Sequence, residues 1–152
     1  MICLERRDNL EIFIDEDSII LKKYSMIEKI PDIAQTLTDA VYTFIKHTII
    51  ITDTDNVIAA TGPLKDKYLN KHISHELEES ILRREKLIQN YFKPFKVIDN
   101  EKMICSYITT TIILSGEVVG MIVILDEKEK VGDIESQVAN VVSSFITKYL
   151  EE

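Results

Sequence analysis

The sequence predicts an α+β protein, built on an antiparallel sheet with an N-terminal and a C-terminal helix on one face. Residues 106–125 contain one charge, Glu117, and many β-branched side chains, which favour strands. Apolar residues recur at helical spacing in residues 30–46 and again in 133–150. Short apolar runs at 48–52 and 57–60 supply two more strands, so the chain holds both kinds of element in one domain.

The stretch 106–125 is long enough to raise the question of a membrane span, since about 20 apolar residues cross a bilayer as a helix. Its interior argues against a span, because it contains polar residues and the turn dipeptide Ser115-Gly116. We therefore predict strands at 107–114 and 118–125 joined by a tight turn. Both faces of these strands are mostly apolar or small, which indicates the central hairpin of a sheet covered on both sides.

The two helices are predicted to form contacts on two sides. Pro31 falls in the first turn of the helix at 30–46, where a missing N–H costs little. The last helix carries two adjacent apolar seams, which imply one contact with the sheet and one with another helix. We therefore predict a homo-oligomer through these terminal helices, with an interface formed by Leu37, Val41, Phe44, Val138, Val141 and Phe145.

Between the first strands and the hairpin, the sequence is more polar. Residues 53–56 are predicted to form an Asx-type turn, because Ile58 and Leu64 stand where a calcium loop needs glycine and glutamate. Residues 64–90 are predicted to be helical, with Ser74 as an N-cap. A short strand is predicted near residues 95–98.

Few side chains suggest a catalytic or metal-binding role. His47 is predicted to cap the first helix or to be exposed, and His72 and His75 to lie on a solvated face without a metal. Cys105 is predicted to be a small buried filler. No phosphate-binding, metalloprotease or catalytic-triad pattern is found, so we predict no catalytic residues and a protein that is not an enzyme.

The composition of the chain limits which binding partners are expected. The chain has 152 residues, about one domain, with 45% hydrophobic and 29% charged residues. A net charge of −8 disfavours binding to nucleic acid or to anionic membranes. Two cysteines make no disulfide framework, and the N-terminus shows no signal peptide. We expect a cytoplasmic protein that does not bind membranes.

Three segments resemble a known family. The order of elements from Ile30 onward resembles a GAF-type sensor domain. The segments LEIFIDEDSIILKKYSMI (10–27), YLNKHIS (68–74) and GEVVGMIVI (116–124) resemble the stage V sporulation protein T family of SpoVT/AbrB-type regulators. In that family, a swapped-hairpin DNA-binding domain precedes a GAF domain. The resemblance implies a transcription regulator and a GAF-like fold.

The resemblance also implies a domain division: a partial swapped-hairpin segment at 1–24, a linker at 25–29 and a GAF-like sensor and oligomerisation domain at 30–152. The alternation in residues 10–24 predicts a β-hairpin. It is expected to be isolated, because the family's preceding basic strand has no counterpart here. No DNA-contacting residue is carried over, and DNA binding is expected only of a full-length form.

The leading functional hypothesis is a sporulation-type regulator represented by its GAF-like sensor and oligomerisation module, with no cofactor named and an unidentified small molecule as ligand. Its pocket is predicted on the sheet face opposite the terminal helices, lined by Tyr91, Phe92, Tyr107, Thr109 and Thr111. Two alternatives stay open. The domain is purely structural, with a pocket filled by side chains, or the chain is a short form that modulates full-length subunits.

Overall fold

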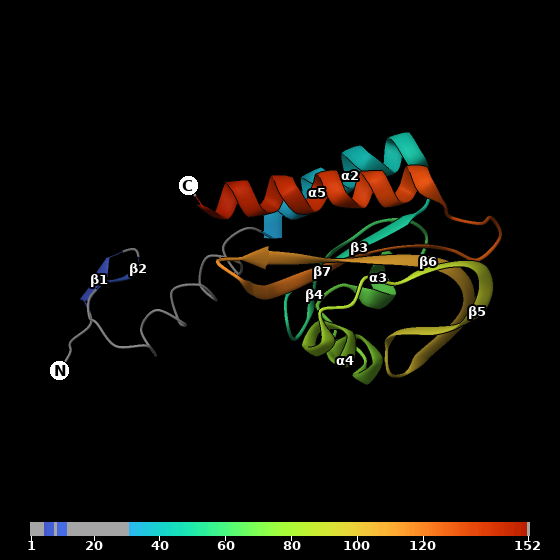
Figure 1. Ribbon diagram of the computed structural model, residues 1–152, viewed down its shortest axis with the longest axis horizontal. Coiled ribbons are helices and arrows are strands. Elements are labelled where there is room, and N and C mark those ends of the chain that lie inside the picture. Colours follow the sequence, from blue (N-terminus) through green and yellow to red (C-terminus); the bar gives the residue numbers. More distant parts are fainter. Residues whose placement is uncertain (1–4, 8, 12–30, 152) are drawn as a thin grey trace.

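The computed structural model describes residues 5–7, 9–11 and 31–151. Five strands form one antiparallel sheet in the order β4-β3-β7-β6-β5. The strands are β3 (Thr48–Thr52), β4 (Val57–Ala60), β5 (Ile88–Ile98), β6 (Glu101–Leu114) and β7 (Glu117–Asp126). Helices α2 (Pro31–Ile45) and α5 (Asp133–Glu151) lie side by side on one face of the sheet (Figure 1). Helices α3 (Lys65–Tyr68) and α4 (His75–Arg83) lie on the other face, which confirms the predicted fold class.

The central hairpin is formed by β6 and β7, as the sequence predicts. Leu114 pairs with Glu117 across the turn, and the two residues between them have positive φ angles, 53° at Ser115 and 82° at Gly116. Two positive φ angles are typical of the type I′ turn, whose twist matches that of the flanking strands. Because β7 pairs with β3 on its other side, this hairpin lies inside the sheet.

The sheet separates two hydrophobic layers. Alternate residues of each strand point to opposite faces, so neighbours such as Ile50 and Ile51 enter different layers. The layer beneath α2 and α5 contains Ile49, Ile51, Ile108, Ile112, Ile122, Ile124, Ala139, Val142, Ile146 and Leu150, among others. The layer beneath α3 and α4 contains Ile50, Tyr68, Leu77, Phe95, Cys105, Met121 and Val123, among others. The apolar seam of α5 that contains Ala139, Val142 and Ile146 therefore packs on the sheet, whereas Tyr149, one turn after Ile146, is 41% exposed.

Helix α2 is attached to the edge of the sheet by a side-chain amide. Gln35 Nε2 donates to the carbonyl oxygen of Ala60 at 2.7 Å, and Gln35 Oε1 accepts from the N–H of Ala60 at 3.1 Å. Ala60 lies on β4, an outer strand of the sheet. One side chain thus satisfies both backbone groups of an edge residue.

Substitution of Gln35 by leucine is expected to lower the free energy of unfolding by about 1–3 kcal/mol, because it leaves two partly buried backbone groups without partners. Chemical denaturation measures this change. Asp39→Ala is the matched control, since it removes only the exposed hydrogen bond that Gln35 makes with Asp39. Equal midpoints for the two variants would contradict the role assigned to Gln35.

The segment 64–90 differs from the prediction of a helical stretch. Two short helices, α3 and α4, occupy part of it, and β5 already begins at Ile88. Ser74 caps α4 as predicted, since its side chain accepts from the N–H of Leu77, and Arg84 ends the helix with a φ of 57°. The strand predicted near 95–98 is the end of an 11-residue strand. Most of β5 is exposed at the sheet edge, where a strand tolerates a residue without an N–H such as Pro94.

The predicted Asx turn at residues 53–56 is present, because Asp53 Oδ1 accepts from the N–H groups of Asp55 and Asn56. Near the N-terminus, β1 (Glu5–Arg7) pairs with β2 (Asn9–Glu11). Apart from Leu10 and Glu11, the hairpin predicted at 10–24 lies outside the described residues, as does the linker at 25–29. In the described part of the chain, none of the helices has the length and hydropathy needed to span a bilayer.

Candidate functional site

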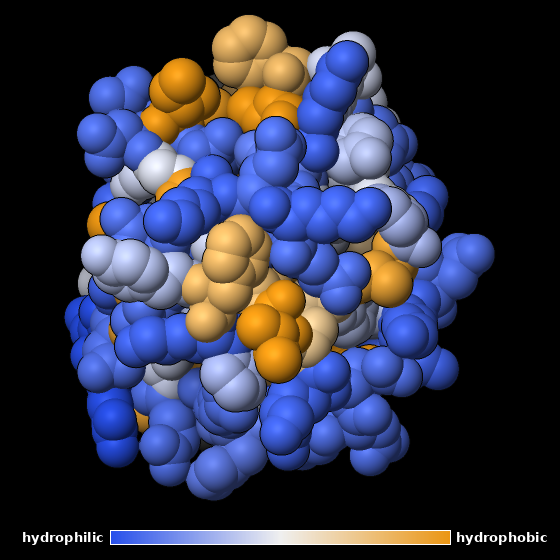
Figure 2. All heavy atoms as spheres, turned by 90° about the vertical axis from the view of Figure 1, so that its right-hand side faces the viewer, coloured by the Kyte–Doolittle hydropathy of each residue, from blue (hydrophilic) through white to orange (hydrophobic). Residues whose placement is uncertain are grey.

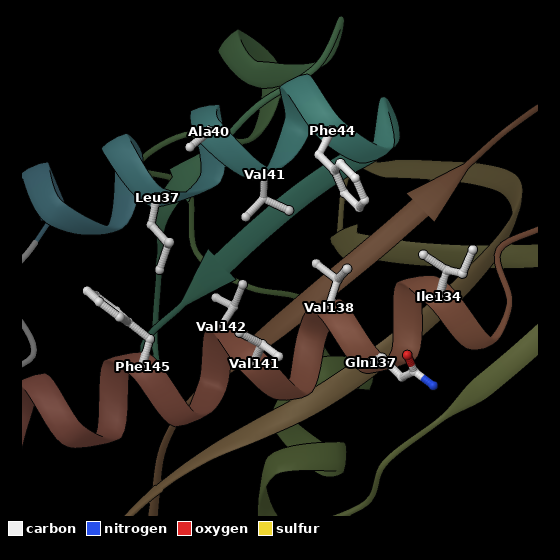
Figure 3. A pocket seen from close by; sticks show the side chains of 10 residues that line it. All are labelled: Leu37, Ala40, Val41, Phe44, Ile134, Gln137, Val138, Val141, Val142 and Phe145. Atoms are coloured by element: carbon white, nitrogen blue, oxygen red, sulfur yellow. The ribbon is translucent and has the colours of Figure 1, made fainter.

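An apolar groove runs between α2 and α5 on the outer side of the helix layer (Figure 3). It encloses about 630 Å³. Leu37, Val41 and Phe44 point from α2 toward α5. The lining comprises Leu37, Ala40, Val41, Phe44, Ile134, Gln137, Val138, Val141, Val142 and Phe145. All six residues predicted at the oligomer interface therefore lie in one groove.

Several of these apolar side chains are unusually accessible. Phe44 is 75% exposed, Val141 67% and Phe145 46%. Phe145 also stacks on Tyr149 one turn later, with ring centroids 6.4 Å apart, so the apolar strip continues toward the end of α5. Figure 2 shows apolar side chains gathered at the helix-bearing top of one end of the molecule, above a mostly hydrophilic face. Exposed apolar strips of this kind mark binding surfaces.

The predicted ligand residues are placed in two different environments. Tyr107, Thr109 and Thr111 alternate along β6. Thr109 is fully buried, where its hydroxyl accepts from the N–H of Leu87 at 3.0 Å, while Tyr107 and Thr111 are half-buried. Tyr91 and Phe92 lie on the outer strand β5, 65% and 39% exposed, and Lys130 Nζ lies 5.1 Å from the Tyr91 ring centroid. The lining of a pocket by these five residues stays a prediction.

The layer under α3 and α4 is closely filled around β6. Tyr107 stacks on Phe95 with ring centroids 3.8 Å apart, and Tyr68 donates a hydrogen bond to Met103 Sδ at 3.7 Å. Burial raises the pKa of Tyr68 to about 12 and that of Cys105 to about 12, and it also raises the pKa of Tyr107. Cys105 is therefore a neutral, fully buried thiol, as predicted, and not an activated nucleophile.

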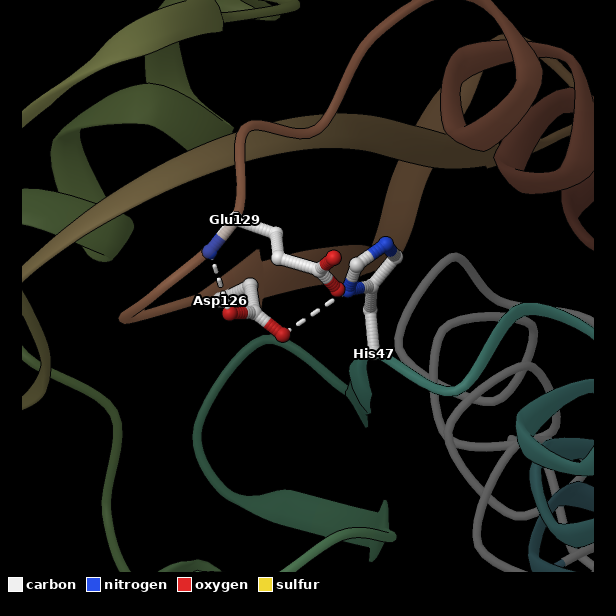
Figure 4. Close-up of side chains that lie close together, drawn as sticks. All are labelled: His47, Asp126 and Glu129. Atoms are coloured by element: carbon white, nitrogen blue, oxygen red, sulfur yellow. Dashed lines mark hydrogen bonds and ion pairs between the residues drawn. The ribbon is translucent and has the colours of Figure 1, made fainter.

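His47 corrects the prediction of a capping or exposed residue. It lies between α2 and β3, and 9% of its side chain is exposed. Its Nδ1 lies 2.8 Å from Asp126 Oδ2, and its Nε2 lies 3.3 Å from Glu135 Oε2 (Figure 4 shows the first pair). No local pattern indicates this arrangement, because His47 and Asp126 are 79 residues apart along the chain.

The acidic partners of His47 are held by backbone groups. Asp126 Oδ1 accepts from the N–H groups of Lys128 and Glu129, and Glu135 Oε1 accepts from the N–H of Gly132. His47, Asp126 and Glu129 also bring potential metal-ligand atoms within 4.8 Å of one another. The other histidines form exposed ion pairs, His75 with Glu79 at 3.1 Å and His72 with Glu78 at 3.7 Å, which agrees with the predicted solvated face.

Asp126 is expected to make stability depend on pH. Burial acts to raise the pKa of its carboxyl, but hydrogen bonds from His47, Glu129 and Lys128 outweigh burial and leave the pKa below its ordinary value. A carboxyl with a lowered folded-state pKa stabilises the fold above its unfolded pKa of about 4, and this contribution is lost as the pH falls below that value.

Asp126→Asn is therefore expected to cost about 1 kcal/mol near pH 6 and progressively less below pH ~4. Urea unfolding at several pH values checks this. Asp53→Asn is the matched control, because Asp53 accepts the same pair of turn hydrogen bonds without a histidine partner among the described contacts. A pH profile that is the same for both variants would contradict the pairing of Asp126 with His47.

Solved structures with similar folds include several GAF domains. The GAF domain of an Acinetobacter phosphoenolpyruvate-protein phosphotransferase matches with a TM-score of 0.64 and 12% identity, covering 91% of this chain and 95% of that one. The cofactor-binding GAF domain of the nutrient sensor CodY from Clostridium difficile matches with a TM-score of 0.58 and 14% identity, covering 88% and 98%. At 12% and 14% identity, the similarity shows that this chain shares the fold of these two domains.

Sequence comparison identifies the family. The model of the family described as "Stage V sporulation protein T C-terminal, transcription factor" matches residues 29–151. Stage V sporulation protein T of Bacillus subtilis (strain 168) is 33% identical over 147 residues, which cover 95% of this chain and 83% of that protein. The chain therefore belongs to the stage V sporulation protein T C-terminal family of transcription factors.

Proposed function

We propose that this chain is a transcriptional regulator of the sporulation type whose GAF-like domain joins copies of the chain. The observation that carries the proposal is the apolar groove between α2 and α5, in which Phe44, Val141 and Phe145 remain accessible. Family membership supplies the regulatory role, and the groove supplies a way to assemble subunits. Regulators that act as symmetric oligomers bind repeated half-sites, so assembly and DNA recognition are coupled.

The occupant that fits the groove best is a second copy of the same two helices. Its lining is apolar except for Gln137, which leaves a strongly charged partner without a counter-charge there. Two copies related by a two-fold axis would bring two α2 and two α5 helices together, so each copy covers the exposed strip of the other. With 15 and 19 residues, these helices are about 22 and 28 Å long, enough for a four-helix arrangement.

Light scattering of the purified chain tests this proposal. We expect a dimer or a larger assembly at micromolar concentration, with no monomer remaining at high micromolar concentration. A chain that remains monomeric at high micromolar concentration would contradict the proposal. A gel-shift assay with a full-length relative, with its groove residues intact or substituted, would then link assembly to DNA binding.

The same proposal assigns a different role to each of three segments of the chain. Residues 1–24 would belong to the DNA-binding part, residues 25–29 would connect it, and residues 30–152 would provide assembly. Residues 30–152 are acidic, like the chain as a whole with its net charge of −8, and this balance opposes contact of the assembly domain with phosphates. In this division, contact with DNA is assigned to the N-terminal part of the chain.

A second candidate function is sensing of a small molecule in the layer under α3 and α4. Thr52 favours it, because its hydroxyl is buried and makes no hydrogen bond in the described part of the chain. Thr52 pairs with Met121 and with Val57, both of which belong to that layer. One structural neighbour is described as a cofactor-binding domain of a nutrient sensor. The stacked Tyr107 and Phe95 instead support the structural alternative, in which side chains fill the pocket.

Native mass spectrometry and thermal-shift screening separate the two roles. A sensor is expected to retain or gain a small molecule that Tyr107→Ala and Thr109→Leu weaken. Flat thermal shifts and no retained molecule would leave assembly as the sole role of the domain.

A further inference from the structure

Three side chains that can bind a metal ion meet at the end of β7. His47 directly precedes β3, Asp126 is the last residue of β7, and Glu129 lies in the loop before α5. One ligand atom from each side chain lies within 4.8 Å of the other two. Figure 4 shows the carboxylates of Asp126 and Glu129 pointing toward the His47 ring. This cluster is separate from the groove, because none of its residues lines the groove.

The His47 ring lies between two carboxylates. Its Nε2 lies 3.3 Å from Glu135 Oε2, and its Nδ1 lies 2.8 Å from Asp126 Oδ2. A neutral imidazole has one N–H donor and one acceptor nitrogen, and an ionised carboxylate can only accept. When Nε2 donates to Glu135, the lone pair of Nδ1 therefore points toward another acceptor. A metal cation at Nδ1 removes this mismatch, because it binds both the nitrogen and the Asp126 oxygen.

Hydrogen bonds fix the two carboxylate ligands from behind. Asp126 Oδ1 accepts from the N–H groups of Lys128 and Glu129, so Asp126 Oδ2 is the oxygen that faces His47. The buried Ser106 hydroxyl donates to the carbonyl oxygen of Glu129 at 2.8 Å. The backbone of Glu129 is thus held on both sides while its carboxylate is left over for a ligand. A site whose supporting contacts already exist loses little entropy when an ion binds.

Glu135 supplies the outer contact that histidine ligands usually have. Metal-binding histidines donate their second ring N–H to a carboxylate or a carbonyl group, which fixes the ring and makes it a better ligand. Glu135 Oε2 faces Nε2 of His47, and Glu135 Oε1 accepts from the N–H of Gly132. Among the described residues, no lysine or arginine forms an ion pair with Asp126, Glu129 or Glu135. A divalent cation would offset this negative charge.

The ligand types favour a transition metal. Magnesium and calcium prefer sites made of oxygen atoms, whereas an imidazole nitrogen suits zinc and its neighbours in the first row. Glu129 is exposed, so water can complete the coordination of an ion held by three protein ligands. We propose that His47 Nδ1, Asp126 and Glu129 bind a zinc ion. Glu135 acts as the positioning residue for the ring, and the ion joins the link between α2 and β3 to the loop that leads into α5.

Zinc binding is measured on the full chain after treatment with EDTA. Calorimetric titration with zinc chloride, together with elemental analysis, is expected to give one zinc ion per chain that millimolar magnesium does not displace. At a free zinc concentration about 100 times the dissociation constant, the melting temperature should rise by about 5–10 °C. His72→Gln combined with His75→Gln removes the two exposed histidines, and this double variant should keep the ion.

Two neighbouring glutamates provide a matched pair of variants. Glu129→Gln removes a proposed ligand at an exposed position and should weaken zinc binding at least tenfold without disturbing the fold. Glu127→Gln removes the same charge from an exposed residue outside the cluster and should bind zinc as wild type does.

Glu135→Gln tests the positioning role. It keeps an oxygen for the N–H of Gly132 and should weaken zinc binding by about 10- to 100-fold. With cobalt(II) in place of zinc, the visible spectrum of Glu135→Gln should match that of wild type, because the three ligands are unchanged. The spectrum of Glu129→Gln should differ, because one ligand is lost.

NMR of the ring nitrogens tests His47 in the folded wild-type chain. Zinc should shift the Nδ1 resonance of His47 and leave Nε2 protonated. Three results would each overturn the site: no zinc-dependent shift at Nδ1, loss of the ion in the double variant at His72 and His75, or equal zinc affinities of Glu129→Gln and Glu127→Gln. These measurements do not depend on self-association, so failure of the proposed assembly leaves the test of the metal site intact.

Discussion

Replacement of Gly120 by alanine is expected to destabilise the protein by about 3 kcal/mol or more, a large part of the 5–15 kcal/mol typical of a domain. Gly120 lies in the central strand β7, beside β3. A Cβ atom on Gly120 would lie 2.2 Å from the carbonyl oxygen of Thr52. That oxygen belongs to the backbone, so it cannot move aside as the end of a flexible side chain could. The two strands would have to separate.

Chemical denaturation and circular dichroism measure the effect. Gly132→Ala is the matched control, because a Cβ there meets nothing within 4 Å among the described atoms and the N–H that contacts Glu135 is kept. We expect the control to stay within about 0.5 kcal/mol of wild type. Should Gly120→Ala unfold at the same denaturant concentration as Gly132→Ala, the close contact between β3 and β7 would be wrong.

Replacement of Val141 by lysine is expected to abolish self-association while leaving the fold intact. Val141 is 67% exposed in the single chain, so a lysine at that position can reach water and costs little folding energy. In the proposed dimer, the same position lies inside an apolar interface, where an unpaired ammonium group is strongly disfavoured. Losses of about 2–4 kcal/mol at such positions correspond to roughly 30- to 1,000-fold weaker binding.

Sedimentation velocity over a concentration series measures the change in association. Ser144→Lys adds the same charge to an exposed position on α5 that does not line the groove, so it should associate as wild type does. Thermal unfolding at low concentration confirms that both variants fold. Equal association constants for Val141→Lys and Ser144→Lys would remove the groove from the interface.

The predictions that came true rested on strong local patterns. The β-branched run around Ser115-Gly116 specified the hairpin, because stiff side chains and a turn that needs positive φ angles act within a few residues. The seams of α2 and α5 were equally visible, and the structure brings their six predicted residues to one groove. Helical periodicity identifies which side chains share a face, which is why these residues were expected to lie together; that a second copy covers them stays a prediction.

Other features depend on contacts that no local pattern shows. Strand β5 was predicted too short, because an edge strand exposed to water needs neither strict alternation nor an apolar composition. His47 was misjudged because its environment consists of Asp126 and Glu135, which the sheet brings from far along the chain. A preference for helix ends says nothing about such distant partners. The filling of the layer around Tyr107 likewise depends on how Phe95 stacks across two strands.

The two edges of the sheet restrict how copies of this chain can add to one another. On β4, the outward backbone groups of Ala60 are already bonded to Gln35. On β5, Pro94 lacks an N–H, and the exposed Lys93 beside it places a charge on the rim. Neither edge offers an uninterrupted ladder to a neighbouring strand. Growth into open-ended β-fibrils by strand addition is therefore opposed at both edges of the sheet.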